Sequence, residues 1–479
     1  MVINLRAITF INGIAVCGLA VAMLIPLIFD ISISTGKCVG VFTPLILACT
    51  FLGGLAILSC KSSEEIVLTR KDAFLLVVSL WCVTVVTCSF PFYIYSGVKL
   101  PFMSALFEAA SGITTTGATI YHDIEALPRA LVLWRFILHF IGGVGIVAIG
   151  IIAFPLMRVG GMQLFLTENS DKSKKFFPRV SQMVGAFVGI YTGVIIAFAI
   201  MLKMCGMNHF DAICHSVSAI STGGFSTKNG GIGWFGSGVI ELIMASAMFV
   251  GGLTFFEIVK CFKTGLRGFW GVQQTRGYIK IVALMIAVPI IVRIVFVEVE
   301  PDITVISDQI FQVISAITTT GYDSSKNYIP PIVLLSLAVI GGCSGSTSGG
   351  IKIFRVQVLY AMVKHHISKV TRPLDVSAPK YQNQRVSSEL ATSVITMIAL
   401  IATVFVVSVF IICVTSNFKL GEGSYSVVSC LFNLGYDSQF SALPALPKLV
   451  LICDMIIGRL EAIPIFVILS RGFWRRSLP

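Results

Sequence analysis

Four stretches of the chain end in a similar polar turn that contains a glycine. The turns read TTTGA at residues 114–118, ISTGG at 220–224, TTTGY at 318–322 and FNLGY at 432–436, and their glycines Gly117, Gly223, Gly321 and Gly435 lie 106, 98 and 114 residues apart. Glycine reaches positive φ at little steric cost, so consecutive carbonyl oxygens can face one side and replace the water around a cation. Neighbouring Thr and Ser hydroxyls can tie such a loop to its surroundings. One copy is most simply a turn signal, whereas four copies at one topological position predict a cation pore.

The elements that hold these turns are expected to be membrane-spanning helices. Only 12% of the 479 residues are charged, 56% are hydrophobic and the mean hydropathy is +0.92. This composition excludes a soluble enzyme, a nucleic-acid-binding protein and a disordered chain. Because a helix of about 20 apolar residues crosses a bilayer, we expect ten spans, at residues 7–29, 38–60, 73–96, 131–157, 180–203, 237–260, 279–299, 329–351, 390–415 and 448–470.

Four apolar stretches between these spans are too short to cross a bilayer. They lie at residues 102–117, 210–223, 310–321 and 425–435, and their length is typical of re-entrant segments. A unit of helix, re-entrant segment and helix therefore occurs four times, and four such units can close around a central pore. The sequence predicts an all-α polytopic membrane protein with two N-terminal helices (1–69) and four pore repeats, at 70–160, 161–268, 269–370 and 371–479.

The basic residues indicate how these helices are oriented. With a cytoplasmic N-terminus, 24 Lys and Arg residues fall in inside segments, nine fall outside and two lie within spans. Cytoplasmic loops usually carry such an excess. It accounts for the net charge of +12 without a nucleic-acid partner, and it predicts that both termini are cytoplasmic and that all four re-entrant segments enter from outside.

A break is expected in the middle of the eighth span. Residues 340–350 contain five glycines and four Ser or Thr residues, which lower helix propensity and compete for backbone hydrogen bonds. Unwound backbone at this depth must line the pore. The alternative is close helix packing through small residues.

Several charged residues lie near the expected pore. Arg459 is near the middle of the last span, where a charge usually marks an ion pathway or a buried partner, and an ion pair with Asp454 or Glu461 is the alternative. Asp323 and Asp437 follow their turns and would concentrate cations at the mouth, or would be solvated loop carboxylates.

Two further charged residues are placed in helices. Glu108, in the first re-entrant segment, is expected to be a hydrogen-bonded structural carboxylate. Arg293 can snorkel or pair with Glu298, and we assign it no function.

Longer phrases around these turns resemble a known family. SGITTTGAT (residues 111–119), ISTGGFST (220–227), ITTTGYDSS (317–325), GGCSGSTSGGIKIFR (341–355) and GRLE (458–461) closely resemble the Trk/Ktr/HKT superfamily of cation transporters. Within it, the chain is similar to the bacterial TrkH type of potassium uptake protein, from about residue 70 to the C-terminus.

The resemblance implies roles for particular residues. The potassium-binding filter would consist of Thr115, Thr116, Gly117, Ser221, Thr222, Gly223, Thr319, Thr320, Gly321, Asn433, Leu434 and Gly435. The gate would consist of an intramembrane loop with Gly341, Gly342, Gly345, Ser346, Gly349 and Gly350, together with Arg459 as an electrostatic barrier. The fourth filter copy departs from the common N-x-G-P-G pattern, since Tyr436 and Asp437 follow Gly435.

The resemblance also implies partners and a location. We expect potassium as the transported ion with no resident cofactor, a homodimer in the bacterial inner (cytoplasmic) membrane, and a cytosolic nucleotide-binding regulatory subunit of the TrkA (RCK or KTN) type. The basic loops 158–179, 260–280 and 352–385 are the expected docking surface for this subunit. Anionic lipid headgroups would explain their charge equally well.

Three other functions compete with this interpretation. A sodium-permeable channel or an ion-coupled secondary transporter could have the same elements, although repeats in secondary transporters usually occur as two halves. A rhomboid-like intramembrane serine protease is suggested by the sequence GCSG around Ser344. Such an enzyme needs a histidine base on a later membrane helix, and only His365 and His366, in an expected cytoplasmic loop, follow Ser344.

Overall fold

The computed structural model describes residues 3–61, 68–157, 180–254, 257–259, 261, 265, 272–296, 303–324, 329–372, 378–382, 384–436 and 440–475. Asp437, the basic loop 158–179 and the side chain of Arg293 lie outside the described residues.

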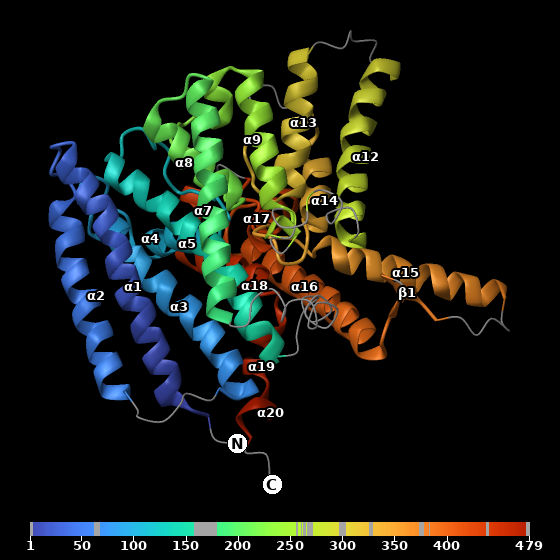
Figure 1. Cartoon of the computed structure of the whole chain (residues 1–479), viewed down its shortest axis with the longest axis horizontal. Coiled ribbons are helices and arrows are strands. Elements are labelled where there is room, and N and C mark those ends of the chain that lie inside the picture. Colours follow the sequence, from blue (N-terminus) through green and yellow to red (C-terminus); the bar gives the residue numbers. More distant parts are fainter. Residues whose placement is uncertain are drawn as a thin grey trace.

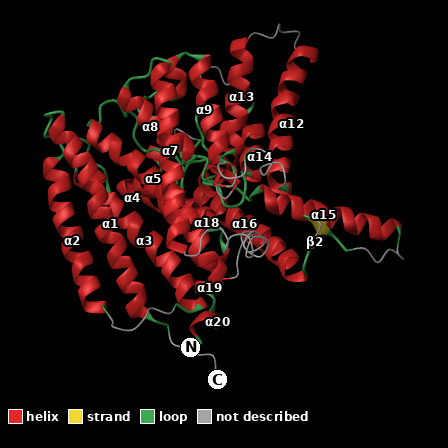
Figure 2. Cartoon of the chain, in the orientation of Figure 1, coloured by secondary structure: helices red, strands yellow, loops and turns green. Residues whose placement is uncertain are grey.

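The described chain is helical apart from one small hairpin (Figures 1 and 2). In chain order, its elements are α1 (Leu5–Ser32), α2 (Val39–Cys60), α3 (Arg70–Ile94), α4 (Phe102–Ile113), α5 (Arg129–Met157), α7 (Val180–Met204), α8 (His209–Ile220), η1 (Ile232–Phe235), α9 (Gly238–Gly251), α12 (Gln273–Phe296), α13 (Ile303–Ile317), α14 (Pro331–Ile340), α15 (Ile353–Thr371), β1 (Lys380–Tyr381), β2 (Gln384–Arg385), α16 (Ser388–Thr415), α17 (Leu420–Leu431), η2 (Phe440–Ala442), α18 (Ala445–Arg459), α19 (Ile463–Leu469) and α20 (Arg471–Trp474). The two strands pair antiparallel, with Lys380 opposite Arg385.

Seven of the described helices are long and apolar enough to span a membrane: α1, α2, α3, α5, α7, α12 and α16. Their outward faces carry large apolar side chains, such as Phe51 (67% exposed) on α2 and Phe410 (68% exposed) on α16. Contiguous exposure of this kind is typical of a surface that faces lipid. The fold class predicted from the sequence, an all-α polytopic membrane protein, is therefore confirmed.

Two of the expected spans are not continuous helices. The span expected at 237–260 ends as α9 at Gly251, and the span expected at 448–470 divides into α18 and α19 between Arg459 and Ile463. At the second break, Glu461 and Ala462 adopt positive φ of 65° and 57°, which lies outside the right-handed helical region and which residues other than glycine rarely adopt. The break predicted in the span 329–351 is present, because α14 ends at Ile340 and α15 begins at Ile353.

The element order repeats four times around the middle of the molecule. Each repeat contains a long helix, a short helix and a third helix: α3–α4–α5, α7–α8–α9, α12–α13–α14 and α16–α17–α18. Local signals begin the short helices: Pro101 precedes α4, and the Asn208 side chain accepts from the Asp211 backbone N–H at α8. The residue boundaries expected between repeats stay predictions.

Buried apolar side chains form two large cores. The first joins α1 to α5 with α16 to α18, so it unites the N-terminal helices with the first and fourth repeats. The second joins α7 to α9 with α12 to α14, so it unites the second and third repeats. The short helices α4 and α17 contribute side chains to the first core, and α8 and α13 to the second. The C-terminal ends of all four lead to the glycine turns.

Candidate ion-conduction site

The four glycine turns share one backbone conformation. Directly after the short helices, Thr115, Thr222, Thr319 and Asn433 have φ between 51° and 56°. Two residues later, Gly117, Gly224, Gly321 and Gly435 have φ between 76° and 82°. Regular helices and strands have negative φ, so the positive φ at both positions gives the four turns a different backbone path. Glycine adopts positive φ with the least strain.

This shared conformation corrects the register of the second repeat. The sequence pattern aligned Gly223 with Gly117, and Ser221 with Thr115. In the structure, Gly224 has the positive φ of the other three glycines, and Gly223 takes the place of Thr116, since the backbone N–H of each bonds to the helix five residues earlier. The signal was ambiguous because this repeat has two adjacent glycines, and only the end of α8 at Ile220 decides between them.

The four turns form a closed ring. A Cβ added to Gly117 would lie 2.2 Å from the carbonyl oxygen of Gly223, and one added to Gly224 would lie 2.0 Å from that of Thr320. A Cβ on Gly321 would meet the Leu434 oxygen, and one on Gly435 would lie 2.1 Å from the Thr116 oxygen. The first turn therefore contacts the second, the second the third, the third the fourth and the fourth the first, as four turns around one axis must.

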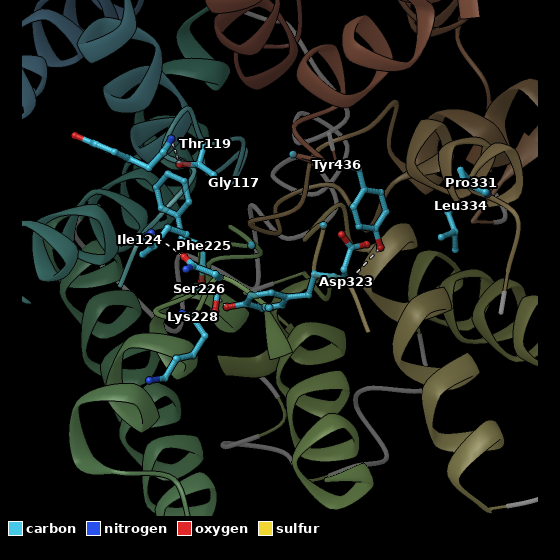
Figure 3. A pocket seen from close by; sticks show the side chains of 18 of the residues that line it. Gly117, Thr119, Ile124, Phe225, Ser226, Lys228, Asp323, Pro331, Leu334 and Tyr436 are labelled. Carbon is cyan, nitrogen blue, oxygen red and sulfur yellow. Dashed lines mark hydrogen bonds between the residues drawn. The ribbon is translucent and has the colours of Figure 1, made fainter. Parts of the chain in front are cut away.

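All four ring glycines line one cavity, which we call the vestibule (Figure 3). Its volume is about 820 Å³, and its other lining residues include Asp323, Lys228 and Tyr436. Lys228 Nζ lies 4.3 Å from the centroid of the Trp234 ring, which offers the ammonium group a cation–π contact. Because the cavity reaches all four ring glycines and Asp323 lines it, a cation can approach the ring through an open space whose wall has at least one carboxylate.

The vestibule raises the pKa of Asp323. The side chain is exposed to the cavity, yet the protein that surrounds it desolvates the carboxylate and raises its pKa from 3.8 to about 6. The Asp323 carboxylate is therefore ionised at neutral pH and titrates in mild acid.

Threonine hydroxyl groups form hydrogen bonds within the first and third turns and to the helices that precede them. In the first turn, Thr114 Oγ1 donates to the Ala110 carbonyl oxygen (2.6 Å) and lies 2.7 Å from Thr116 Oγ1. Thr318 makes the equivalent contacts in the third turn, at 2.6 Å to the Ile314 oxygen and 2.8 Å to Thr320 Oγ1. These bonds tie each turn to the short helix that precedes it, and the role of the hydroxyls in a filter stays a prediction.

The fourth turn is anchored in a different way. Asn433 Nδ2 donates to Thr116 Oγ1 (2.9 Å) and to the Met455 carbonyl oxygen (3.0 Å), so one amide joins the fourth turn to the first turn and to α18. Leu434 is fully buried in the second apolar core. These contacts explain how this unusual copy completes the ring without the Thr hydroxyls of the first and third turns.

A buried ion pair lies behind the first turn. Arg135 Nε is 2.7 Å from Glu108 Oε1, and both side chains are fully buried. Glu108 also accepts from Thr119 Oγ1 (3.1 Å) and from the Ile120 backbone N–H (3.0 Å). Glu108 is therefore the hydrogen-bonded structural carboxylate that was predicted, and Arg135 is its buried partner.

Loop 341–352 contacts the segments that hold the second, third and fourth turns. Thr347 Oγ1 donates to the Ile220 (2.9 Å) and Gly251 (3.0 Å) carbonyl oxygens, and the Gly349 backbone N–H donates to Thr319 Oγ1 (2.6 Å). A Cβ on Gly349 would lie 2.2 Å from the Phe432 carbonyl oxygen. The loop is thus bonded to the second and third repeats and in close contact with the fourth, and the alternative of a small-residue helix packing face is wrong.

Arg459 binds this loop from the side of α18. Its Nη1 donates to the Thr347 carbonyl oxygen (2.5 Å) and its Nη2 to the Gly142 carbonyl oxygen (3.4 Å). The suggested partners are engaged elsewhere, because Asp454 accepts from Ser408 Oγ (2.8 Å) and Glu461 pairs with Arg355. Within the described residues, Arg459 is therefore a buried cation bonded to carbonyl oxygens, and its Nε has no hydrogen-bond partner.

In three repeats, a glycine on the third helix packs against the short helix. A Cβ on Gly142, Gly251 or Gly458 would lie 2.0, 2.5 or 1.9 Å from the last carbonyl oxygens of α4, α8 and α17, respectively. Only glycine allows the third helix of each repeat to come this close to the short helix that holds the turn.

Comparison with known proteins agrees with this architecture. Residues 40–474 match the family model described as "TrkH: Cation transport protein". The chain belongs to the TrkH family. It is 31% identical over 490 residues to the Trk system potassium uptake protein TrkH of Salmonella typhimurium, which covers 98% of this chain and 100% of the relative. It is 30% identical over 496 residues to TrkG of Escherichia coli, with 98% and 99% covered.

A solved TrkH-family structure has the same fold along the whole chain. The crystal structure of the potassium transporter TrkH from Vibrio parahaemolyticus matches with a TM-score of 0.91 and 28% identity, covering 99% of this chain and 100% of that one. Since TrkH proteins are cation transporters, this chain is a transport protein and not an enzyme.

The serine protease alternative also lacks its geometry. His215 is hydrogen-bonded through Nδ1 to the Asp211 carbonyl oxygen (2.8 Å) and through Nε2 to Ser226 Oγ (3.1 Å). His139 Nδ1 is hydrogen-bonded to Ser218 Oγ (3.2 Å). In the part of the chain that the structure describes, no histidine is hydrogen-bonded to Ser344.

Proposed function

We propose that this TrkH-family protein takes up potassium across the bacterial cytoplasmic membrane through the ring of four glycine turns. The observation that carries the proposal is the closed ring itself, in which Gly117, Gly224, Gly321 and Gly435 line the floor of one vestibule. The names of the relatives, which are potassium uptake proteins, favour potassium over sodium as the transported ion.

The ring supplies what a cation loses when it leaves water. Main-chain carbonyl oxygens of Thr115 to Gly117 and of the equivalent residues in the other turns replace the hydration shell. The C-terminal ends of α4, α8, α13 and α17 directly precede the turns. Each such helix end carries a partial negative charge of about half an electron, so all four favour a cation at the ring. No bond is made or broken, and the membrane potential drives the ion inward.

Loop 341–352 and Arg459 form the proposed gate. The loop occupies the space beneath the ring through bonds from Thr347 and Gly349, and the Arg459 guanidinium donates to the Thr347 carbonyl oxygen. A buried cation on the ion path opposes the passage of another cation. Opening then requires the loop to exchange these bonds for other partners, with Gly341 (φ 72°) and Gly350 (φ 81°) as hinges.

The remaining expectations belong to this proposal. They comprise a homodimer, cytoplasmic termini, an inner-membrane location, potassium as the only ligand without a resident cofactor, and a TrkA-type nucleotide-binding subunit that drives the gate from the cytoplasmic side. Helix α15 projects away from the helical bundle (Figure 1) and, with residues such as Lys364 and Lys369, offers a basic surface to that subunit.

Growth rescue of bacteria that lack potassium uptake, at low external potassium, tests the filter. Gly117→Ser places a Cβ about 2 Å from the Gly223 carbonyl oxygen, so we expect a distorted ring that admits more sodium and rescues less well. Gly236→Ser is the matched control, because Gly236 also has positive φ (57°) but has no atom within 4 Å of an added Cβ. Unchanged ion preference in Gly117→Ser would count against the filter assignment.

The same bacteria, which lack potassium uptake of their own, are used to test the gate. Arg459→Ala removes both hydrogen bonds to carbonyl oxygens and the buried charge, so basal potassium flux should rise at least tenfold, given that a hydrogen bond from a charged donor contributes about 1.5–3 kcal/mol. Arg471→Ala, at the start of the exposed C-terminal turn α20, is the control. A flux in Arg459→Ala equal to that of the parent would show that Arg459 does not obstruct the ion.

A further inference from the structure

The residue after each ring glycine differs among the four repeats. The position is occupied by Ala118, Phe225, Tyr322 and Tyr436. Tyr436 OH donates to the Tyr322 carbonyl oxygen (3.1 Å), and Tyr322 OH donates to the Phe225 carbonyl oxygen (2.9 Å). Each phenol therefore reaches the same backbone position in the preceding repeat and ties two neighbouring turns together.

These two tyrosines are held firmly. Tyr322 is 1% exposed and Tyr436 is 4% exposed. Ser315, on α13, adds a second donor to the Tyr322 carbonyl oxygen (3.0 Å), and Tyr436 OH also contacts Ser315 Oγ (3.4 Å). In Figure 3, Tyr436 and Asp323 point toward one another at the edge of the vestibule. The carbonyl oxygens of Phe225 and Tyr322 are thus engaged by protein donors at the outer end of the ring.

An arginine replaces the phenol between the second and first repeats. Phe225 has no hydroxyl, but the Arg135 guanidinium lies 3.9 Å from the centroid of its ring, and Arg135 Nη1 donates to the Ser226 carbonyl oxygen (3.4 Å). Glu108 connects Arg135 to the first turn through its bonds from Thr119 and Ile120. A belt of contacts therefore runs from the fourth turn through the third and second to the first.

The belt has an opening between the first and fourth turns. Ala118 has no hydroxyl that could reach the fourth repeat. Within the described residues, these two turns are joined by the Asn433 amide on Thr116. Thr116 lies one residue before Gly117 and Asn433 two residues before Gly435, so this bond is at a different level of the ring. The outer end of the ring is consequently tied at three of its four boundaries.

We propose that Tyr322 and Tyr436 are positioning residues for ion selectivity, which fix the width of the outer end of the ring. The proposal rests on the ring being the proposed potassium filter. Sodium is smaller than potassium, so it is coordinated well only if the carbonyl oxygens move inward. Phenol bonds between neighbouring turns oppose that movement, and their loss lets the ring contract around sodium while potassium binding changes little.

The test compares ion fluxes of purified protein in liposomes loaded with either potassium or sodium. Tyr322→Phe and Tyr436→Phe keep the ring packing and remove only the hydroxyl. Each should raise the sodium-to-potassium flux ratio about fivefold, the factor equivalent to one typical hydrogen bond. Tyr121→Phe is the matched control, because Tyr121 also lines the vestibule but its buried hydroxyl has no hydrogen-bond partner within the described residues.

The outcomes separate the belt from the filter. If the parent prefers potassium and the two tyrosine variants keep its ratio, or lose both fluxes equally, the belt does not set selectivity and the proposal is wrong. If the parent itself shows no preference for potassium, the proposed function fails first. A thermal unfolding midpoint in detergent, measured for each variant, identifies any variant whose flux changes only because it unfolds.

Discussion

Asp323 is the acidic side chain of the vestibule wall, two residues beyond Gly321. Its surroundings raise its pKa to about 6, so its negative charge is present at pH 7.5 and is lost as the external pH falls through about 6 and below. We expect the apparent KM for potassium uptake to rise roughly threefold over this range, as the loss of one charge acting through several Å of water implies. Initial uptake rates at external pH 7.5 and 5.0 provide the measurement.

Asp323→Asn separates this effect from other titrating groups. The variant should show the high KM at both pH values and lose most of the pH dependence, because the asparagine is neutral throughout. His122 and Lys228 also line the vestibule, and a pH dependence that survives in Asp323→Asn would show that Asp323 is not its source. Raising external potassium should shift the midpoint to lower pH, since a nearby cation stabilises the carboxylate.

Residue-level predictions succeeded where the side chain carries a distinct local signal. The glycines of the first, third and fourth turns were identified correctly, because each has one glycine followed by a different residue. The second turn has two adjacent glycines. The sequence pattern aligned Gly223 with the other three, whereas in the structure Gly224 has the positive φ that they share. The Arg135–Glu108 pair and the two tyrosine bonds join residues from different segments, so no spacing in the sequence could have revealed them.

At the scale of elements, loop 341–352 depends on a few hydrogen bonds that can be removed one at a time. Thr347→Val keeps the side-chain shape and removes the Oγ1 bonds to the Ile220 and Gly251 carbonyl oxygens. The single hydroxyl proton is shared between these two oxygens, so its loss is equivalent to one hydrogen bond of about 0.5–1.5 kcal/mol, and basal potassium flux should rise roughly fivefold if the loop closes the pore. Ser336→Ala, which removes an exposed hydroxyl on the neighbouring α14, should leave flux unchanged.

The helix breaks show what hydropathy can and cannot predict. The break after α14 was predictable, because glycine and hydroxyl residues dominate residues 340–350. The break between α18 and α19 was not, because Glu461 and Ala462 adopt positive φ in a stretch whose apolar residues continue on both sides. Hydropathy measures whether a segment prefers lipid, and it does not contain the tertiary contacts, such as the Arg355–Glu461 pair, that hold an irregular backbone.

At the scale of the whole molecule, the charge distribution predicts an orientation in the membrane. The two termini lie at one end of the structure, and α8 lies at the opposite end (Figure 1). The excess of Lys and Arg was assigned from the sequence to the side that carries both termini, which is the side expected to face the cytoplasm. With the predicted orientation, the vestibule, whose lining includes Gly224 and Gly231 between α8 and α9, would open to the outside, as the proposed uptake requires.

Reporter fusions test this orientation directly. Green fluorescent protein joined to the C-terminus should fluoresce, and alkaline phosphatase joined there should be inactive, because the first matures in the cytoplasm and the second only outside it. Alkaline phosphatase joined after Phe235, at the end of η1, should be active. The reverse pattern would place the vestibule in the cytoplasm. The ring would then receive potassium from the wrong side of the membrane, and the same architecture could only support a function other than uptake.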